Sequence, residues 1–163
     1  MLHQDVLMPR FEPFAGIRYA PTVDADEVVA PPYDVMSDAE RASYAARSRA
    51  NAVRFDAPVG TDPYAEAARV FEGLQADGTL VTDDTSSLYV YRMTNGDRHT
   101  TGVIGALGIG DDDVLPHEQT TKKAKSDRLD LLRATHANLS PIWGLSLANG
   151  LADDLLSTTC LAR

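Results

Sequence analysis

The chain has 163 residues, of which 44% are hydrophobic and 24% are charged, and its formal net charge is −9. This composition is typical of a folded globular protein, and a chain of this length buries enough apolar surface to fold without disulfides. The acidic balance argues against a nucleic-acid-binding protein, because neutralising phosphates requires a basic surface.

The sequence predicts neither a membrane span nor a secretory signal, and no internal disulfide is expected. No apolar run approaches the ~20 residues that a membrane-spanning helix needs, and the opening MLHQDVLMPR lacks the apolar centre of a secretory signal. Cys160 is the only cysteine, so no disulfide can form within the chain. We therefore expect one cytoplasmic domain over residues 1–163, with no membrane partner.

The first third of the chain predicts short extended segments around one helix. Aromatic and β-branched residues mixed with Pro and Gly over residues 11–19 indicate a short strand beside a bend. The two prolines of VVAPPYD, residues 28–34, favour an extended segment. A helix is expected from a cap at Ser37 or Asp38 to about Arg49, with Glu40 at capping-box spacing. NAVRFD, residues 51–56, is interpreted as another strand.

The middle of the chain predicts a helix and a β-hairpin. Asp62 at the cap and Pro63 at the first helical position begin the helix, which Gly78 ends. Strands over residues 88–93 and 98–106 flank Thr94-Asn95-Gly96-Asp97, and Asn-Gly predicts a type I′ turn. The three aromatic side chains of the later region are expected in the core: Tyr89, Tyr91 and Trp143.

After a loop over residues 108–113, a helix is predicted from about Asp127 to His136, then a strand from Pro141 to Leu147 and a short helix from about Leu151. The aspartates at 111–113 are interpreted as a solvated acidic loop rather than a cation site. Helices and strands alternate irregularly around an antiparallel hairpin. The fold class is therefore predicted to be α+β, a mixed, partly antiparallel sheet with flanking helices.

All the lysines of the chain fall within four residues: Lys122, Lys123 and Lys125. Arg128 and Arg133 follow just downstream. In an acidic protein such a basic island attracts anions, and the N-terminus of the helix predicted from Asp127 would help to bind phosphate. A solvated basic loop is the alternative interpretation.

Glu118 is the candidate general base. It follows a proline-rigidified bend, Leu115-Pro116-His117, at the end of a predicted strand, and such positions often hold catalytic groups rigidly. The alternative is that Glu118 caps the following turn and His117 satisfies a backbone carbonyl. Ser140 and Cys160 have no base near them in sequence, so a nucleophilic role is unsupported for either.

Three stretches together resemble the bacterial and archaeal DUF1015 family: FEPFAGIRY, VVAPPYDVMS and VLPHEQTTKKAKSDRLDLLRATHANLSPIWGL. The resemblance runs from about residue 11 to 147. That family continues beyond this length and carries a DGHHRY-type motif that this sequence lacks. The resemblance therefore implies that the chain is an N-terminal portion of a longer protein or a truncated member.

The PHEQ string is also similar to that of free-serine kinases of the ParB/sulfiredoxin superfamily, which phosphorylate L-serine with ADP or ATP. This resemblance implies a ParB/sulfiredoxin-like element in the C-terminal half and a base at Glu118, with His117 beside it in the site. Nucleotide with Mg²⁺ is the expected cofactor, and no metal site made by the protein alone is expected.

Two function classes follow. The first is a small-molecule kinase-like phosphotransferase in which Glu118 takes the proton from a hydroxyl while basic side chains stabilise the phosphoryl group. The basic island supplies the candidates for those side chains, which are Lys122, Lys123, Lys125 and Arg128. The second is a non-catalytic nucleotide- or anion-binding regulator, which the missing DGHHR favours for this chain. An uncovered sheet edge would favour a homodimer.

Overall fold

The computed structural model describes residues 10–109, 114 and 122–144, with the side chains of residues 122–124 left out. The chain forms two compact units, each assembled from segments that are far apart in sequence. Unit 1 comprises residues 1–16, 83–117 and 141–163, and unit 2 comprises residues 17–82 and 118–140. The described part combines helices with antiparallel strand pairs, so the predicted α+β class is confirmed.

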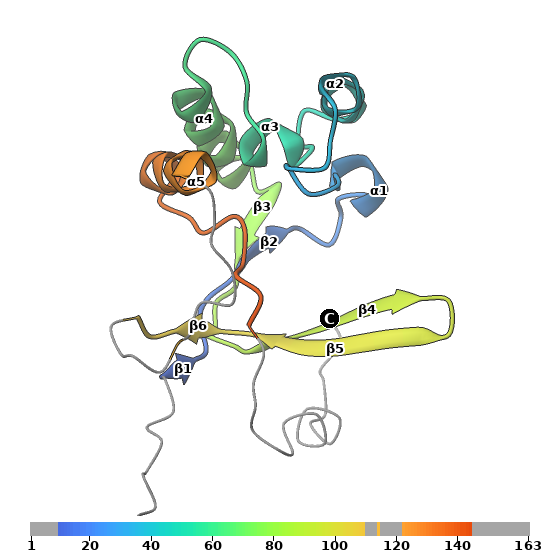
Figure 1. The fold of residues 1–163 in the computed structure, drawn as a ribbon, viewed down its shortest axis with the longest axis vertical. Helices are drawn as coiled ribbons and strands as arrows, with labels where there is room; N and C mark the ends of the chain where they lie inside the picture. The colour runs from blue at the N-terminus through green and yellow to red at the C-terminus, as the bar shows by residue number, and fades with distance from the viewer. Residues whose placement is uncertain (1–9, 110–113, 115–121, 145–163) are drawn as a thin grey trace, which may run out of the picture. The chain divides into compact units, whose positions relative to one another are not determined.

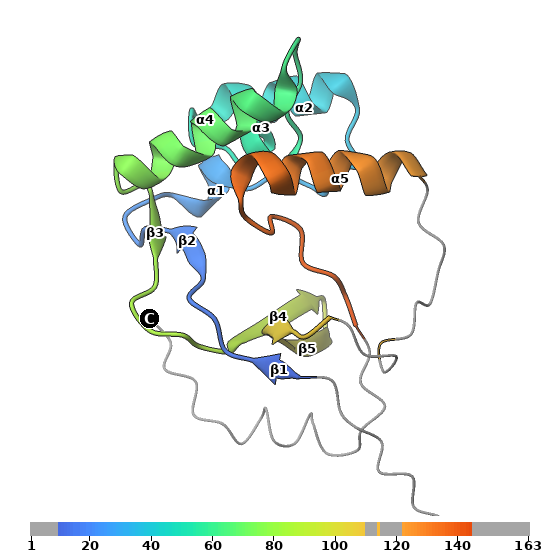
Figure 2. The same cartoon turned by 90° about the vertical axis from the view of Figure 1, so that its left-hand side faces the viewer.

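Unit 2 contains five helices and one strand pair in its described part (Figure 1). Strand β2 (Ile17–Tyr19) pairs antiparallel with β3 (Leu80–Thr82). The helices are α1 (Ala25–Val28), α2 (Asp38–Arg47), α3 (Val53–Asp56), α4 (Pro63–Ala76) and α5 (Lys122–Thr135). Helices α4 and α5 lie side by side and run in the same direction (Figure 2).

The ends of α2 and α4 confirm the predictions from capping residues. Ser37 caps α2, and its backbone N–H donates to Glu40 at 2.9 Å to complete the capping box. The Ser37 hydroxyl also donates to Glu40, at 2.6 Å, and the hydrogen bonds from the Ser37 side chain and backbone lower the pKa of Glu40. Asp62 caps α4 by accepting from the Ala65 N–H at 3.3 Å, with Pro63 at the first helical position. Gly78, with a φ of 77°, follows the end of α4.

The segment predicted as a strand over residues 51–56 is instead helix α3, and Asn51 explains why. Its side chain is fully buried and donates to the carbonyls of Glu27 and Val29, while its Oδ1 accepts from the Val53 N–H. Such Asn side chains favour turns by competing with ladder hydrogen bonds. The buried Val53 and Phe55 gave the segment the residue types of a strand.

Helix α5 begins five residues earlier than predicted, at Lys122 instead of Asp127. Lysine and alanine are good helix formers, and KKAKS contains no breaker, so nothing delays the start of the helix. The lysines therefore belong to the helix rather than to a loop before it.

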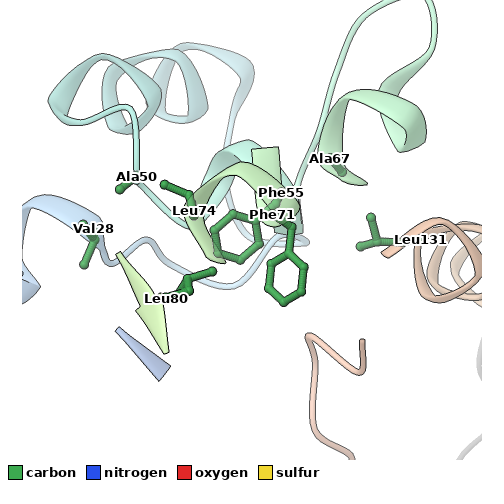
Figure 3. Close-up of a cluster of buried hydrophobic side chains, with 8 residues drawn as sticks. All are labelled: Val28, Ala50, Phe55, Ala67, Phe71, Leu74, Leu80 and Leu131. Atoms are coloured by element: carbon green, nitrogen blue, oxygen red, sulfur yellow. The ribbon is translucent and has the colours of Figure 1, made fainter. Parts of the chain in front are cut away.

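The described core lies in unit 2 (Figure 3). Phe55 and Phe71 pack with their ring centroids 5.5 Å apart. Tyr19 borders this core and donates its hydroxyl to the Ala50 carbonyl at 2.7 Å, and burial raises its pKa to about 12. The cluster draws on four helices, one strand and the segment before α3: Val28, Ala50, Phe55, Ala67, Phe71, Leu74, Leu80 and Leu131.

The described part of unit 1 consists mainly of strand pairs. β1 (Phe11–Glu12) pairs with β6 (Ala106–Leu107), and β4 (Tyr89–Asn95) pairs with β5 (Arg98–Ile104). Asn95 faces Arg98 in the register, so the hairpin loop is Gly96-Asp97, one residue later than predicted. Gly96 has a φ of 58° and Asp97 has no positive φ. This pattern matches a type II′ turn instead of the predicted type I′.

The aromatic side chains of unit 1 correct a second prediction. Trp143 is 67% exposed and Tyr91 45% exposed, so neither belongs to a core. Tyr89 is partly buried against Phe14, with the ring centroids 5.1 Å apart. Its hydroxyl accepts from the Gly16 N–H at 2.7 Å and donates to Asp83 at 2.9 Å.

The predicted strand from Pro141 has no regular structure over residues 141–144, and its remainder, the helix from Leu151 and the aspartates at 111–113 lie outside the described residues. Among the helices that the structure describes, none has the length and apolar character needed to cross a membrane.

Candidate functional site

The predicted site residues fall into three groups in the structure. His117 and Glu118 lie outside the described residues. Lys122 and Lys123 are described only as backbone in the first turn of α5. Lys125 and Arg128 are described in full, and they differ sharply in their surroundings.

The first turn of α5 carries positive charge at the positive end of the helix dipole. It contains no acidic residue, whereas the first turns of α1, α2, α3 and α4 each contain at least one. Cations are unfavourable at a helix N-terminus, and anions are favourable there. We call residues 122–125 of this helix the lysine end. A phosphate bound at this end would relieve the unfavourable charge arrangement.

Lys125 is exposed, and no described residue pairs with it. Its ammonium group can therefore reach a ligand without first breaking a contact within the described part of the protein. Of the predicted anion ligands, it is the one whose described surroundings fit that role directly.

Arg128, one turn further along α5, has its guanidinium enclosed by protein oxygen atoms. It donates from Nη1 to Asp56 Oδ1 at 2.9 Å and from Nη2 to the Asp56 carbonyl at 2.7 Å. Nε and Nη2 both donate to Asp127 Oδ2, at 3.1 and 2.9 Å, and Nη1 reaches Ser140 Oγ at 3.3 Å. A guanidinium has five N–H groups, so these five hydrogen bonds account for all of them.

The flat face of the same guanidinium lies over the ring of Tyr33, with Cζ 3.9 Å from the ring centroid. Cation–π contacts of this kind stabilise by about 0.5–2 kcal/mol. Tyr64, at the start of α4, donates its hydroxyl to the other carboxylate oxygen of Asp127 at 2.9 Å, which raises the pKa of Tyr64. We call the set that meets at this point the Arg128 cluster: Tyr33, Asp56, Tyr64, Asp127, Arg128 and Ser140.

Local structure brings these side chains together. Asp56 is the last residue of α3, which the buried Asn51 starts. Tyr33 lies in a turn closed by the Val35 N–H donating to the Pro32 carbonyl at 3.2 Å. Each of the two segments is therefore held by hydrogen bonds that do not involve α5.

The chemistry available to the cluster is limited by its charge pairing. Ser140 Oγ donates to Asp56 Oδ1 at 3.1 Å, so a carboxylate does lie beside this hydroxyl. The same oxygen accepts from Arg128, and an ion-paired carboxylate is a weak proton acceptor. The pairing therefore fits a structural role for Ser140 better than that of a nucleophile.

The sequence indicates Arg128 as a candidate ligand but does not indicate its partners in the cluster. Asp56 lies 72 residues from Arg128 and 84 residues from Ser140, and no local pattern connects it to either. Tyr33 and Ser140 do lie within stretches on which the family resemblance rests, which was the one signal available.

The chain belongs to the family described as protein of unknown function (DUF1015), whose model matches residues 11–163. Neither a curated protein nor a solved structure matches the chain at a significant level.

Proposed function

We propose that this DUF1015 protein is a kinase-like phosphotransferase that moves a phosphoryl group from ADP or ATP, with Mg²⁺, to the hydroxyl of a small molecule such as free serine. The lysine end of α5 would hold the phosphates, and Glu118 would act as the base. The observation that carries the proposal is that α5 begins on the lysines, shortly after the PHEQ string in the sequence, with no acid in its first turn.

The reaction needs mainly positioning and positive charge from a protein. Glu118 accepts the proton of the substrate hydroxyl, and His117 lies next to it in the chain. The freed oxygen forms a bond to the terminal phosphorus as the bond between that phosphorus and the bridging oxygen breaks. The nucleotide leaves as AMP or ADP. The ammonium groups of Lys122, Lys123 and Lys125 would neutralise its charge, and bound Mg²⁺ would supply further positive charge.

The test is turnover by the intact protein. We expect O-phosphoserine to form when the protein is incubated with L-serine, Mg²⁺ and ADP or ATP, followed by ³¹P NMR. Glu118→Gln should lower the rate by about 10²–10⁴-fold, the contribution typical of general-base catalysis. Glu72→Gln is the matched control, because Glu72 is an exposed residue of α4. Unchanged turnover in Glu118→Gln would exclude Glu118 as the base.

A second candidate is a non-catalytic nucleotide- or anion-binding regulator. It is favoured by the Arg128 cluster, whose described carboxylates, Asp56 and Asp127, are both paired with the guanidinium and so are poor bases. Binding of ADP without formation of any phosphorylated product would support this function over the kinase.

A further inference from the structure

We infer that Arg128 is a positioning residue that orients the lysine end of α5, and that it does not itself bind the phosphate. The inference rests on the proposed anion site and assigns a different role to one of its predicted ligands.

The first argument is the state of the guanidinium. All five N–H groups already donate to oxygen atoms of Asp56, Asp127 and Ser140. The side chain is only 22% exposed. A phosphate could bind Arg128 only by displacing protein acceptors from it.

The second argument is the charge around the group. The carboxylates of Asp56 and Asp127 both lie 2.9 Å from the guanidinium. An anion at this place would meet two like charges at close range, in a partly buried site where water screens them weakly. The described surroundings therefore disfavour a phosphate at Arg128 itself.

The third argument concerns the segments of the chain that Arg128 links together. Arg128 joins α5 to the end of α3 through Asp56, to the turn at Tyr33, and to Ser140 beyond the end of the helix. These anchors approach α5 from separate segments, so they restrain its rotation about its own axis. Lys125 lies three residues earlier and shares this side of the helix, since residues i and i+3 are neighbours on a helix surface.

The experiment is calorimetric titration of the intact protein with ADP and Mg²⁺, and separately with inorganic phosphate. The Asp56→Asn variant distinguishes a positioning role of Arg128 from a ligand role, because the two roles predict opposite changes in affinity. If Arg128 positions α5, loss of the ion pair weakens binding, by about tenfold for a small misplacement. If Arg128 is a ligand, loss of a competing carboxylate strengthens binding.

Two further pairs of variants guard against simple loss of folding. Tyr33→Leu removes the ring under the guanidinium and should weaken binding, whereas the conservative Tyr33→Phe should restore it. Arg128→Lys should weaken binding by about tenfold. Arg54→Lys is its matched control, because Arg54 donates to the Ala45 and Ser48 carbonyls and forms no hydrogen bond or ion pair with a described side chain of α5. All variants are compared at a temperature where circular dichroism shows each of them folded.

The outcomes separate this inference from the proposed function. No binding of either ligand by the wild-type protein overturns the proposed site and this inference with it. Wild-type binding with equal or tighter binding by Asp56→Asn overturns the inference alone. Weaker binding by Asp56→Asn, Tyr33→Leu and Arg128→Lys, with Arg54→Lys unchanged, supports it.

Discussion

The two units differ in what holds their described parts together. All nine buried hydrophobic side chains in the described part of the chain belong to unit 2. In unit 1 the hairpin of β4 and β5 is held by its ladder, and apolar side chains on it, including Val90 and Met93, are exposed. Unit 2 is thus stabilised by burial of apolar surface, and the described part of unit 1 mainly by hydrogen bonds.

This difference bears on function. A site works best on elements whose own positions are fixed by packing. Helix α5, which carries the lysine end and Arg128, packs on α4 and buries Leu131 in the core of unit 2. The proposed anion site is therefore built on the better-packed unit, and the following variants test that difference between the units.

The largest expected effect is that of Phe71→Ala. Phe71 is 4% exposed and packs on Phe55, so truncation should lower the free energy of unfolding by about 3–5 kcal/mol through lost burial and a cavity. Met93→Ala in the hairpin should change it by less than about 1 kcal/mol, because Met93 is 37% exposed. Urea unfolding measures both. Equal effects would contradict the difference in packing between the units.

Asn51→Ala should have the next largest effect. It leaves two buried carbonyls and the Val53 N–H without their partner, and we expect a loss of about 2–3 kcal/mol in the free energy of unfolding. Asn138→Ala at an exposed position is the control and should stay within about 0.5 kcal/mol. A small effect at Asn51 would mean that α3 does not depend on this side chain.

Tyr89→Phe tests the hydrogen bonding of unit 1. The hydroxyl accepts from the Gly16 N–H and donates to Asp83, so its removal should cost about 1–2 kcal/mol. It should also speed hydrogen exchange at the Gly16 amide, measured by NMR. Tyr91→Phe is the control, since Tyr91 is exposed. Unaltered exchange at Gly16 in Tyr89→Phe would show that the bond does not protect this amide.

The smallest expected effect is a pH dependence at Asp77, just after α4. Hydrogen bonds from Thr79 and Arg49 lower the pKa of this carboxyl from 3.8 to about 2. Because the pKa is lower in the folded state, the stabilisation is present above about pH 4 and is lost as pH falls toward 2. Asp77→Asn should therefore show a shallower loss of stability between pH 4 and 2, measured by urea unfolding. A slope equal to that of the wild type would contradict the shift.

Local signals in the sequence predicted local structure well. Ser37 with Glu40, and Asp62 with Pro63, gave the starts of α2 and α4 because capping depends on neighbours in sequence. These local signals did not predict the structure where contacts between residues far apart in the sequence determine it. Helix α1 and strand β3 were not predicted, and residues 51–56 form a helix because Asn51 is buried against the backbone of Glu27 and Val29.

The candidate site also combines a feature that the sequence predicts with contacts that only the fold creates. The lysine end was found from the sequence because its residues are contiguous, although its place within α5 was not. The Arg128 cluster joins Tyr33, Asp56 and Ser140 across the chain, and only the fold brings them together. The role of Glu118 as a base remains a prediction from the resemblance.

The most direct test of the proposed function is the affinity of the intact protein for ADP and Mg²⁺ when the lysine end is removed. In calorimetric titrations, a variant with Lys122, Lys123 and Lys125 all changed to Ala should bind at least about 100-fold more weakly than the wild type, because charge-assisted contacts to phosphate are lost. The control changes three exposed arginines elsewhere, Arg69, Arg92 and Arg98, to Ala and removes the same charge. Weaker binding by the lysine variant alone is the predicted result, and equal affinity of the two variants would contradict the site.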